Sequence, residues 1–168
     1  MTTTPAAAPT FAKGLVGVVA AQTALSSVDG ANGNLTYRGL NIHDLAGRVL
    51  YEEIVYLLSF GKLPNKKELA RLTAELAANR KLPKAVIDHI RSAPRKATPM
   101  DVLRSAVSML AYYDKETEDI SIEATQRKAL RLVAQFPTII AAIHRVRQGK
   151  PLIAPRPKLT HAANFMYM

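Results

Sequence analysis

The sequence contains neither cysteine nor tryptophan. Without cysteine, disulfide bonds, thiolate nucleophiles and metal sites with cysteine ligands are excluded. Aromatic residues make up only 6% of the 168 residues, whereas alanine and leucine are abundant. Because sheet sandwiches favour β-branched and aromatic residues, this composition predicts an all-α fold of closely packed helices.

Long apolar runs are also missing. The longest, around residues 15–21 and 139–143, are far shorter than the roughly 20 residues that cross a bilayer. Residues 1–12 have neither the basic start and apolar centre of a secretory signal nor the arginines of a mitochondrial presequence. We expect residues 1–12 to form a flexible tail, and the protein to be cytoplasmic with no membrane partner.

Acidic residues are few, and none follows Glu123. The chain has 23 Lys and Arg against 13 Asp and Glu, which gives a formal net charge of +10. Such an excess attracts anions, among them nucleic acid and carboxylated or phosphorylated small molecules, unless acidic residues outside this chain balance it. A nucleic-acid-binding module would gather its cations on one face, whereas Arg127, Arg131 and Arg145 alternate around helices with apolar stripes. We therefore expect no nucleic-acid partner.

Residues 13–40 have a pattern of their own. Residues 16–28 alternate valine and other apolar residues with small polar ones, which predicts extended segments. Residues 29–34 (DGANGN) tolerate positive φ angles, and residues 35–38 (LTYR) predict a short strand. This segment is therefore expected to form a small β-hairpin whose turn lies at residues 29–34.

Residues 41–168 carry the start and stop signals of helices. Among these signals are a capping box from Asn65 to Glu68 and a Thr cap at Thr98 that is followed by Pro99. Predicted helices occupy residues 41–50, 51–60 up to Gly61, the stretch after Asn65, the stretch from a first-turn Pro83 to Pro94, the stretch from Thr98 to Tyr113, and a long helix capped by Ser121 and kinked at Pro137. The long helix is expected to bury Ala129, Val133, Phe136, Ile140 and Ile143.

The last two segments complete the array. Residues 150–158 contain three prolines and predict an extended linker. Residues 159–168 begin like a buried helix and end without a Gly, Asn or basic cap, so we expect the folding unit to continue past Met168. Residues 41–168 would then be an antiparallel helical array, truncated at its C-terminal end.

Candidate chemistry is sparse. Glu52 and Glu53 point in adjacent rather than converging directions, and residues 116–119 predict a solvated acidic loop. Ser105 and Ser108 lie on an apolar helix face with neither a base nor an oxyanion pocket in view. The histidines lack any paired metal-ligand spacing and are expected to have packing or surface roles; they are His43, His89, His144 and His161. No catalytic, cofactor-binding or metal-ligating residue is predicted.

Six short segments stand out when they are taken together. They are residues 14–18 (GLVGV), 29–39 with DG and LTYRG, 52–64 with EEIVYLL and GKLP, 99–108 (PMDVLRSAVS), 137–142 (PTIIAA) and 159–168 (LTHAANFMYM). In this order and approximate spacing they cover the chain from about Lys13 to its end. Together they resemble the N-terminal part of citrate synthases, in the shorter bacterial and archaeal form.

The resemblance implies an almost wholly helical, homodimeric two-domain enzyme, of which residues 41–168 supply the first part of the large domain. Such enzymes condense acetyl-CoA with oxaloacetate and water to citrate and CoA, without a further cofactor. The family's catalytic Asp and His residues and its dicarboxylate-binding arginines follow the last segment, so none maps onto Asp101 or His161. The chain alone is expected to be inactive. The alternatives are a 2-methylcitrate synthase that uses propionyl-CoA and a non-catalytic helical interaction protein.

Overall fold

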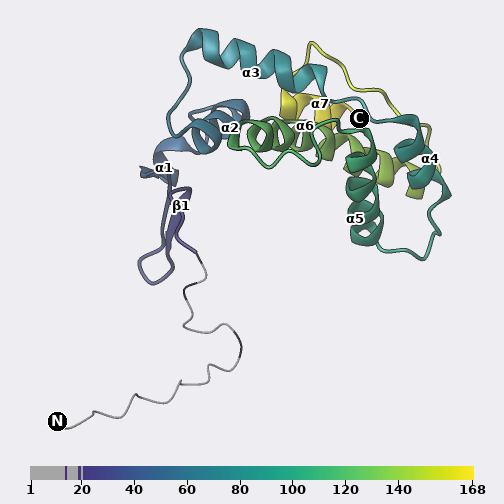
Figure 1. Cartoon of the computed structure of the whole chain (residues 1–168), viewed down its shortest axis with the longest axis horizontal. Helices are drawn as coiled ribbons and strands as arrows, with labels where there is room; N and C mark the ends of the chain where they lie inside the picture. Colours follow the sequence, from purple (N-terminus) through teal and green to yellow (C-terminus); the bar gives the residue numbers. More distant parts are fainter. Residues whose placement is uncertain (1–13, 15–18, 20) are drawn as a thin grey trace.

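The computed structural model describes residues 14, 19 and 21–168. The predicted flexible tail at residues 1–12 and the extended residues 16–18 lie outside the described residues. In the described part a small sheet lies at one end and helices make up the rest, as Figure 1 shows. The elements are β1 (Ser26–Asp29), β2 (Asn34–Tyr37), β3 (Leu40–Asn41), α1 (Ile42–Leu45), α2 (Tyr51–Phe60), α3 (Lys66–Ala78), α4 (Lys84–Ser92), α5 (Pro99–Leu110), the 3₁₀ turn η1 (Ala111–Tyr113), α6 (Ile122–Arg147) and α7 (His161–Tyr167). The prediction of a helical fold with a small β-hairpin is confirmed.

The sheet is antiparallel with strand order β1-β2-β3. Val28 pairs with Leu35 across the predicted turn, which confirms the hairpin. The sequence analysis missed β3, which pairs Leu40 with Tyr37. Arg38 and Gly39 have φ angles of 49° and 83°, so these two left-handed residues reverse the chain directly after β2.

The helix starts that were predicted from capping residues are confirmed. The Asn65 side chain accepts hydrogen bonds from the backbone N–H groups of Lys67 and Glu68, and Glu68 Oε2 accepts one from the Asn65 N–H at 2.8 Å. Thr98 and Ser121 cap α5 and α6 in the same way, through their hydroxyl oxygens. These caps supply partners for N–H groups that have none inside the helix.

Three predicted helix boundaries are wrong. The helix predicted for residues 41–50 ends at Leu45, and Gly47 then adopts a φ of +73° that a helix does not allow. Pro83 is the residue before α4 rather than part of its first turn. The helix predicted to reach Tyr113 becomes a 3₁₀ turn after Leu110, and Tyr113 is exposed.

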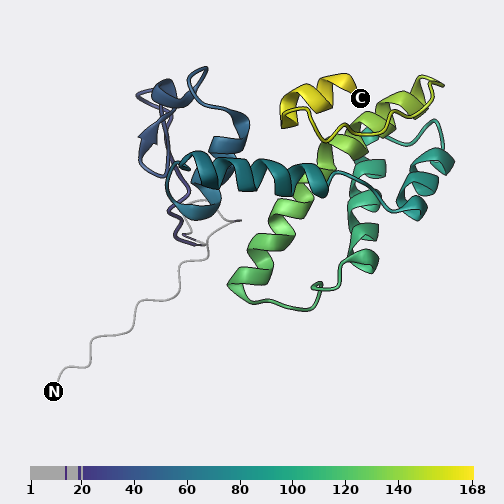
Figure 2. The same cartoon turned by 90° about the horizontal axis from the view of Figure 1, so that it is seen from above.

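Helix α6 connects two apolar cores. Its first half packs with α2 and α3 around Leu72, Leu76 and Leu130, and its second half packs with α4 and α5 around Val86, Ile90 and Ile139. Figure 2 shows α6 crossing the molecule and changing direction near its middle, consistent with the kink expected at Pro137.

The predicted buried face of α6 is confirmed only in part. Ala129 and Ile140 are exposed while their neighbours Leu130 and Ile139 are buried, and Val133 and Phe136 are half-buried. Ile143 is buried as predicted. The second half has apolar residues on nearly all sides, so the apolar periodicity there does not identify one face.

The predicted linker is confirmed, because residues 150–156 have no regular structure and lead through a turn to α7. Helix α7 packs against α2, α3 and α6. At its end the N–H of Met168 donates to the Asn164 carbonyl at 3.1 Å, and Met168 is buried.

Candidate functional site

Five polar or charged residues are buried among the described residues, and α7 contributes two of them. They are Glu52, Arg80, Thr138, His161 and Asn164. They come from α2, the connection between α3 and α4, α6, and α7. We call this group the α7 cluster.

Glu52 and Tyr51 of α2 hold the start of α7. The Glu52 carboxylate accepts a hydrogen bond from the backbone N–H of His161 at 2.7 Å. The rings of Tyr51 and His161 are stacked, with centroids 4.9 Å apart and an interplanar angle of 9°. Glu52, which the sequence presents only as one of two adjacent acids, therefore binds the start of a helix that lies 109 positions further along the chain.

Arg80 holds the segment that precedes α7. It is only 1% exposed, and its Nη1 donates to the carbonyls of Arg156 and Leu159 at 2.8 and 3.0 Å. Thr138 Oγ1 donates to the Arg80 carbonyl at 2.9 Å. Nε and Nη2 of Arg80 have no hydrogen-bond partner within the described part of the chain. Burial lowers the pKa of this guanidinium, and the nearby Glu52 carboxylate opposes the shift.

The His161 side chain is a buried base. Its Nδ1 has no hydrogen-bond partner among residues 21–168. Burial is the main cause that lowers its pKa, the charge of Arg80 adds to the effect, and Glu52 opposes it. Thr138 lines a surface hollow beside α4, whereas His161 and Arg80 line neither this hollow nor another one beside α5. The side chains of His161 and Arg80 therefore hold α7 in place and do not face either of these hollows.

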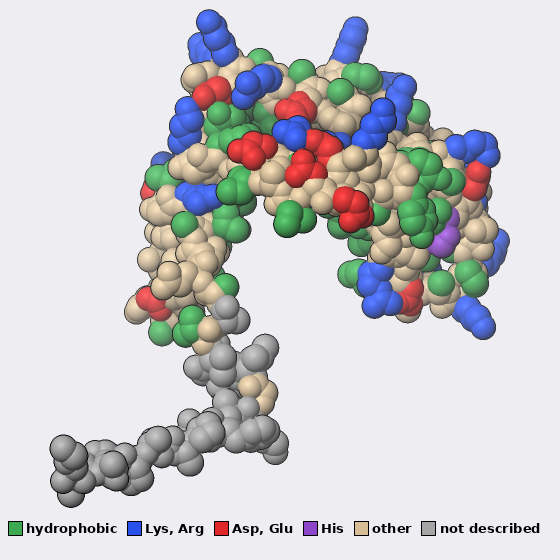
Figure 3. Space-filling view, viewed as in Figure 1, with side chains coloured by type: hydrophobic (Ala, Val, Ile, Leu, Met, Phe, Trp, Pro, Cys, Tyr) green, Lys and Arg blue, Asp and Glu red, His purple; other side chains and the backbone are tan. Residues whose placement is uncertain are grey.

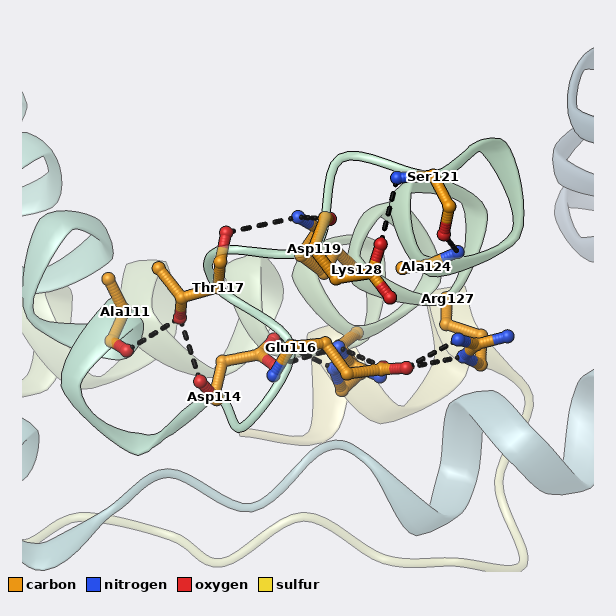
Figure 4. A network of polar contacts seen from close by, with 10 residues as sticks. Ala111, Asp114, Glu116, Thr117, Asp119, Ser121, Ala124, Arg127 and Lys128 are labelled. Atoms are coloured by element: carbon orange, nitrogen blue, oxygen red, sulfur yellow. Dashed lines mark hydrogen bonds and ion pairs between the residues drawn. The ribbon is translucent and has the colours of Figure 1, made fainter.

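A second polar group lies on the surface, in the loop before α6 (Figure 4). Arg131 donates Nε and Nη2 to the two Asp114 carboxylate oxygens at 2.9 and 2.8 Å, and Glu116 accepts from both Arg127 and Arg131. The bonds from these arginines hold the pKa of Glu116 below its ordinary value. The predicted acidic loop lies on the surface, with Glu118 and Asp119 exposed, and the arginines of α6 bind Asp114 and Glu116 within it.

This loop forms one wall of a hollow of about 790 Å³ between α5 and α6. Its other walls are largely apolar and include Leu82, Val107 and Leu132. A smaller hollow of about 420 Å³ lies between α4, α6 and residues 152–155, with Lys84, Arg91 and Arg145 at its edge. Asp88 pairs with Lys84 and Arg91, whereas Arg145 bonds to backbone carbonyls. The hollows bring together cations and apolar surface, without a nucleophile–base pair.

The expectation that no base lies near Ser105 is wrong. His89 Nε2 of α4 is 2.8 Å from Ser105 Oγ of α5. The Ser105 hydroxyl, however, also lies 3.0 and 3.1 Å from the backbone carbonyls of Asp101 and Val102; when it donates to one of them, the His89 ring is the donor to Ser105. A general base would have to accept the serine proton, and this arrangement has the opposite direction. Because the two residues meet only when α4 packs on α5, sequence spacing could not reveal them.

The remaining candidates stay apart. His43 and His144 are exposed, and Asp101 accepts bonds from Thr98 and Arg104 at the start of α5. Within residues 21–168 no three acidic or histidine side chains meet in a way that could hold a metal ion. None of the helices described has the length and apolarity to span a bilayer. That the chain holds no catalytic or cofactor-binding residue stays a prediction.

Nearly the whole chain is similar to known proteins. A family model described as "Citrate synthase, C-terminal domain" matches residues 14–168. A citrate synthase of Deinococcus radiodurans is 45% identical over 158 residues, which are 94% of this chain and 42% of that protein. A 2-methylcitrate synthase of Mycobacterium tuberculosis is 39% identical over 95% of this chain and 40% of its own length. The crystal structure of citrate synthase from Pyrobaculum aerophilum has a TM-score of 0.86 and 38% identity, and the match covers 92% of this chain and 41% of that one.

Proposed function

The chain belongs to the citrate synthase family, and we propose that it forms the N-terminal part of a citrate synthase subunit. The complete subunit would condense acetyl-CoA with oxaloacetate and water to citrate and CoA, at the entry to the tricarboxylic acid cycle. The 45% identity to a citrate synthase across 94% of the chain carries this proposal. The chain spans about two fifths of the length of that relative. The acid, the base and the dicarboxylate-binding residues would therefore come from the remaining three fifths.

The chain alone should not turn over substrate. Condensation requires an acid, a base and a carboxylate clamp within hydrogen-bond reach of one another, and neither the α7 cluster nor the two hollows bring such groups together. A thiol-release assay with acetyl-CoA and oxaloacetate tests this. We expect no release of CoA from the chain, and release from a fusion that joins it to the remaining C-terminal part of the Deinococcus radiodurans enzyme.

Two results would overturn the proposal. Turnover by the isolated chain would show that it carries its own catalytic residues. A folded but inactive fusion would show that the chain does not replace the N-terminal part of that enzyme; the intact Deinococcus radiodurans enzyme is the positive control.

A 2-methylcitrate synthase is the second candidate, because one such enzyme is 39% identical to this chain. The two activities differ by one methylene group in the acyl-CoA, which a pocket distinguishes by about 1–3 kcal/mol. The comparison of kcat/KM for acetyl-CoA and propionyl-CoA, measured on the complete enzyme, separates them. A preference for propionyl-CoA would favour the second candidate.

We further propose that the complete protein is a cytoplasmic homodimer that binds its two anionic substrates. The net charge of +10 suits such substrates. On the face that Figure 3 draws, the Lys and Arg side chains are spread over several elements and do not form the single patch that a nucleic-acid-binding surface would need. In a filter-binding titration we expect the protein not to bind nucleic acid. Nanomolar affinity that falls steeply with salt would contradict the proposal that it has no nucleic-acid partner. If no active fusion with the Deinococcus radiodurans enzyme can be obtained, a non-catalytic helical interaction protein becomes the better interpretation of this chain.

A further inference from the structure

The smaller of the two hollows has an apolar floor and a cationic edge. It lies between α4, the second half of α6 and residues 152–155, and every residue that lines it falls within residues 81–155. We propose that this hollow binds an aliphatic carboxylate of medium chain length, whose hydrocarbon chain lies on the floor while its carboxylate meets the cations of the edge. This inference is independent of the proposed enzymatic activity.

The floor is formed by apolar side chains from three separate segments. They include Leu82, Ile87, Ala141, Ala142, Leu152 and Ile153. The one uncharged polar side chain in the lining, Thr138, is 8% exposed and donates its hydroxyl to the Arg80 carbonyl. The floor therefore binds through the apolar area that it removes from water, and not through a free hydrogen-bond donor.

The size of the hollow limits the ligand. Its volume of about 420 Å³ lies toward the lower end of the roughly 300–1,000 Å³ that pockets for small molecules enclose. A hydrocarbon chain of medium length suits this volume better than a long-chain lipid does.

The edge of the hollow has an excess of positive charge. Lys81, Lys84, Arg91 and Arg145 line it, and Asp88 is the one acidic side chain in the lining. Asp88 pairs with both Lys84 and Arg91, so a single carboxylate serves two cations. An anionic ligand at this edge reduces the repulsion among the four cations, which a neutral ligand does not.

Arg145 fixes the side of the hollow that residues 152–155 form. Its guanidinium donates to the Pro151 carbonyl, directly before these residues. A bond to a carbonyl does not neutralise the guanidinium, so Arg145 holds this segment and still contributes its charge to the edge. The walls are thus in place before a ligand binds, which lowers the entropy cost of binding.

The larger hollow is less suited to the same ligand. Two acidic side chains, Asp114 and Glu116, belong to its lining, and both pair with Arg131. A ligand carboxylate there would meet two carboxylates instead of one. The two hollows can be told apart by substitution, because Lys84 and Ala154 line only the smaller one and Lys115 lines only the larger one.

Isothermal titration calorimetry with sodium octanoate tests the site. Sodium hexanoate and the uncharged octanamide are the comparison ligands. We expect one octanoate to bind per chain, and hexanoate to bind on the order of tenfold more weakly, because each buried CH₂ group tightens binding by about fourfold. Octanamide should bind more weakly than octanoate, and the affinity for octanoate should fall as salt is added.

Three variants locate the site. Ala154 is exposed, so Ala154→Phe should fill the hollow without disturbing a core and should abolish octanoate binding. Lys84→Gln should weaken binding by about two- to fivefold, as expected for the loss of an exposed charge. Lys115→Gln is the matched control and should leave the affinity unchanged. Circular dichroism checks that each variant is folded.

The same titration on the fusion with the Deinococcus radiodurans enzyme shows whether the hollow stays open in a longer subunit. Binding by the chain that is absent from the folded fusion would show that further polypeptide occupies the hollow, and would overturn the proposal. So would equal affinities for octanoate and octanamide, unchanged binding in Ala154→Phe, or no binding of octanoate at all. If the isolated chain does not fold, the fusion decides; if Ala154→Phe does not fold, unchanged binding in Lys84→Gln contradicts the site.

Discussion

Arg80 and Glu52 bind partners that are 76 and 109 residues away in the sequence. Neither residue differs in its local sequence from ordinary surface residues on helices. The sequence presents Glu52 only as one of two adjacent acids, and no local signal marks Arg80. Their burial depends on the return of the chain at α7 across α2 and the end of α3, which no local spacing encodes. Sequence reasoning therefore missed the polar contacts that hold α7.

The first prediction concerns Arg80. Replacement by Met removes the donor to the Arg156 and Leu159 carbonyls and leaves the nearby Glu52 carboxylate without its positive neighbour. Loss of one member of a buried charged group destabilises proteins by about 3–5 kcal/mol, so we expect Arg80→Met to lower the free energy of unfolding by about 3 kcal/mol. Urea unfolding followed by circular dichroism measures this loss of unfolding free energy.

Arg104→Met is the control for Arg80→Met. It removes an exposed ion pair and should leave the urea midpoint almost unchanged. Equal effects of the two substitutions would contradict the role of Arg80.

The second prediction concerns Glu68, which bonds Lys62 and the Asn65 backbone. The Lys62 ammonium, followed by the Asn65 N–H, lowers the pKa of Glu68 to about 2. Because the folded-state pKa lies below the unfolded value, the ionised group stabilises the fold above about pH 4.5, and this contribution is lost as the pH falls toward 2. We expect Glu68→Gln to destabilise the protein at pH 7 and to reduce the loss of stability between pH 5 and pH 2.

Urea midpoints at a series of pH values, for wild-type, Glu68→Gln and Glu118→Gln, test this prediction. Glu118 is exposed and serves as the matched control. A steeper acid dependence in Glu68→Gln than in the wild-type chain would show that the sign is wrong.

At the scale of elements, the helix starts that carry a capping side chain were more predictable than the buried faces. The caps at Asn65, Thr98 and Ser121 use side chains within three residues of the N–H groups that they bind, so the local sequence contains the whole arrangement. The face of α6 depends on which partners surround it. Since apolar residues lie on nearly every side of its second half, several faces fit equally well, and the predicted one includes Ile140, which is exposed.

The third prediction tests the observed face with two neighbouring isoleucines in α6. Ile139 is fully buried between α4 and α5, whereas Ile140 is 40% exposed. Ile139→Ala should cost about 2–5 kcal/mol of unfolding free energy, because it leaves a cavity in a close-packed core. Ile140→Ala should cost less than about 1.5 kcal/mol, and urea unfolding of both variants makes the comparison. A larger loss for Ile140→Ala would mean that the face predicted from the sequence is the correct one.

At the scale of the whole molecule, the six segments that resemble citrate synthases were sufficient to predict the family. Segments such as PMDVLRSAVS and LTHAANFMYM fold into α5 and α7, and the solved structure from Pyrobaculum aerophilum matches 92% of the chain. The order of the six segments along the chain is what indicated the family. Composition indicated the helical class but could not indicate the packing of α7, because that packing depends on single polar contacts across the molecule.

The fourth prediction concerns association of the whole chain. Helix α7 is held on its inner side by the α7 cluster, while Phe165 and Met166 are 39% and 83% exposed. The relative from Deinococcus radiodurans has more than twice the matched length, and in such a subunit further polypeptide could cover this apolar face. We expect the isolated chain to self-associate, so that its mass by size-exclusion chromatography with light scattering increases with concentration.

Met166→Lys should reduce this association, whereas Val28→Lys, at an exposed apolar position in β1, should not. A chain that stays monomeric across the concentration series would contradict the prediction, and an equal effect of the two substitutions would place the contact elsewhere than on α7.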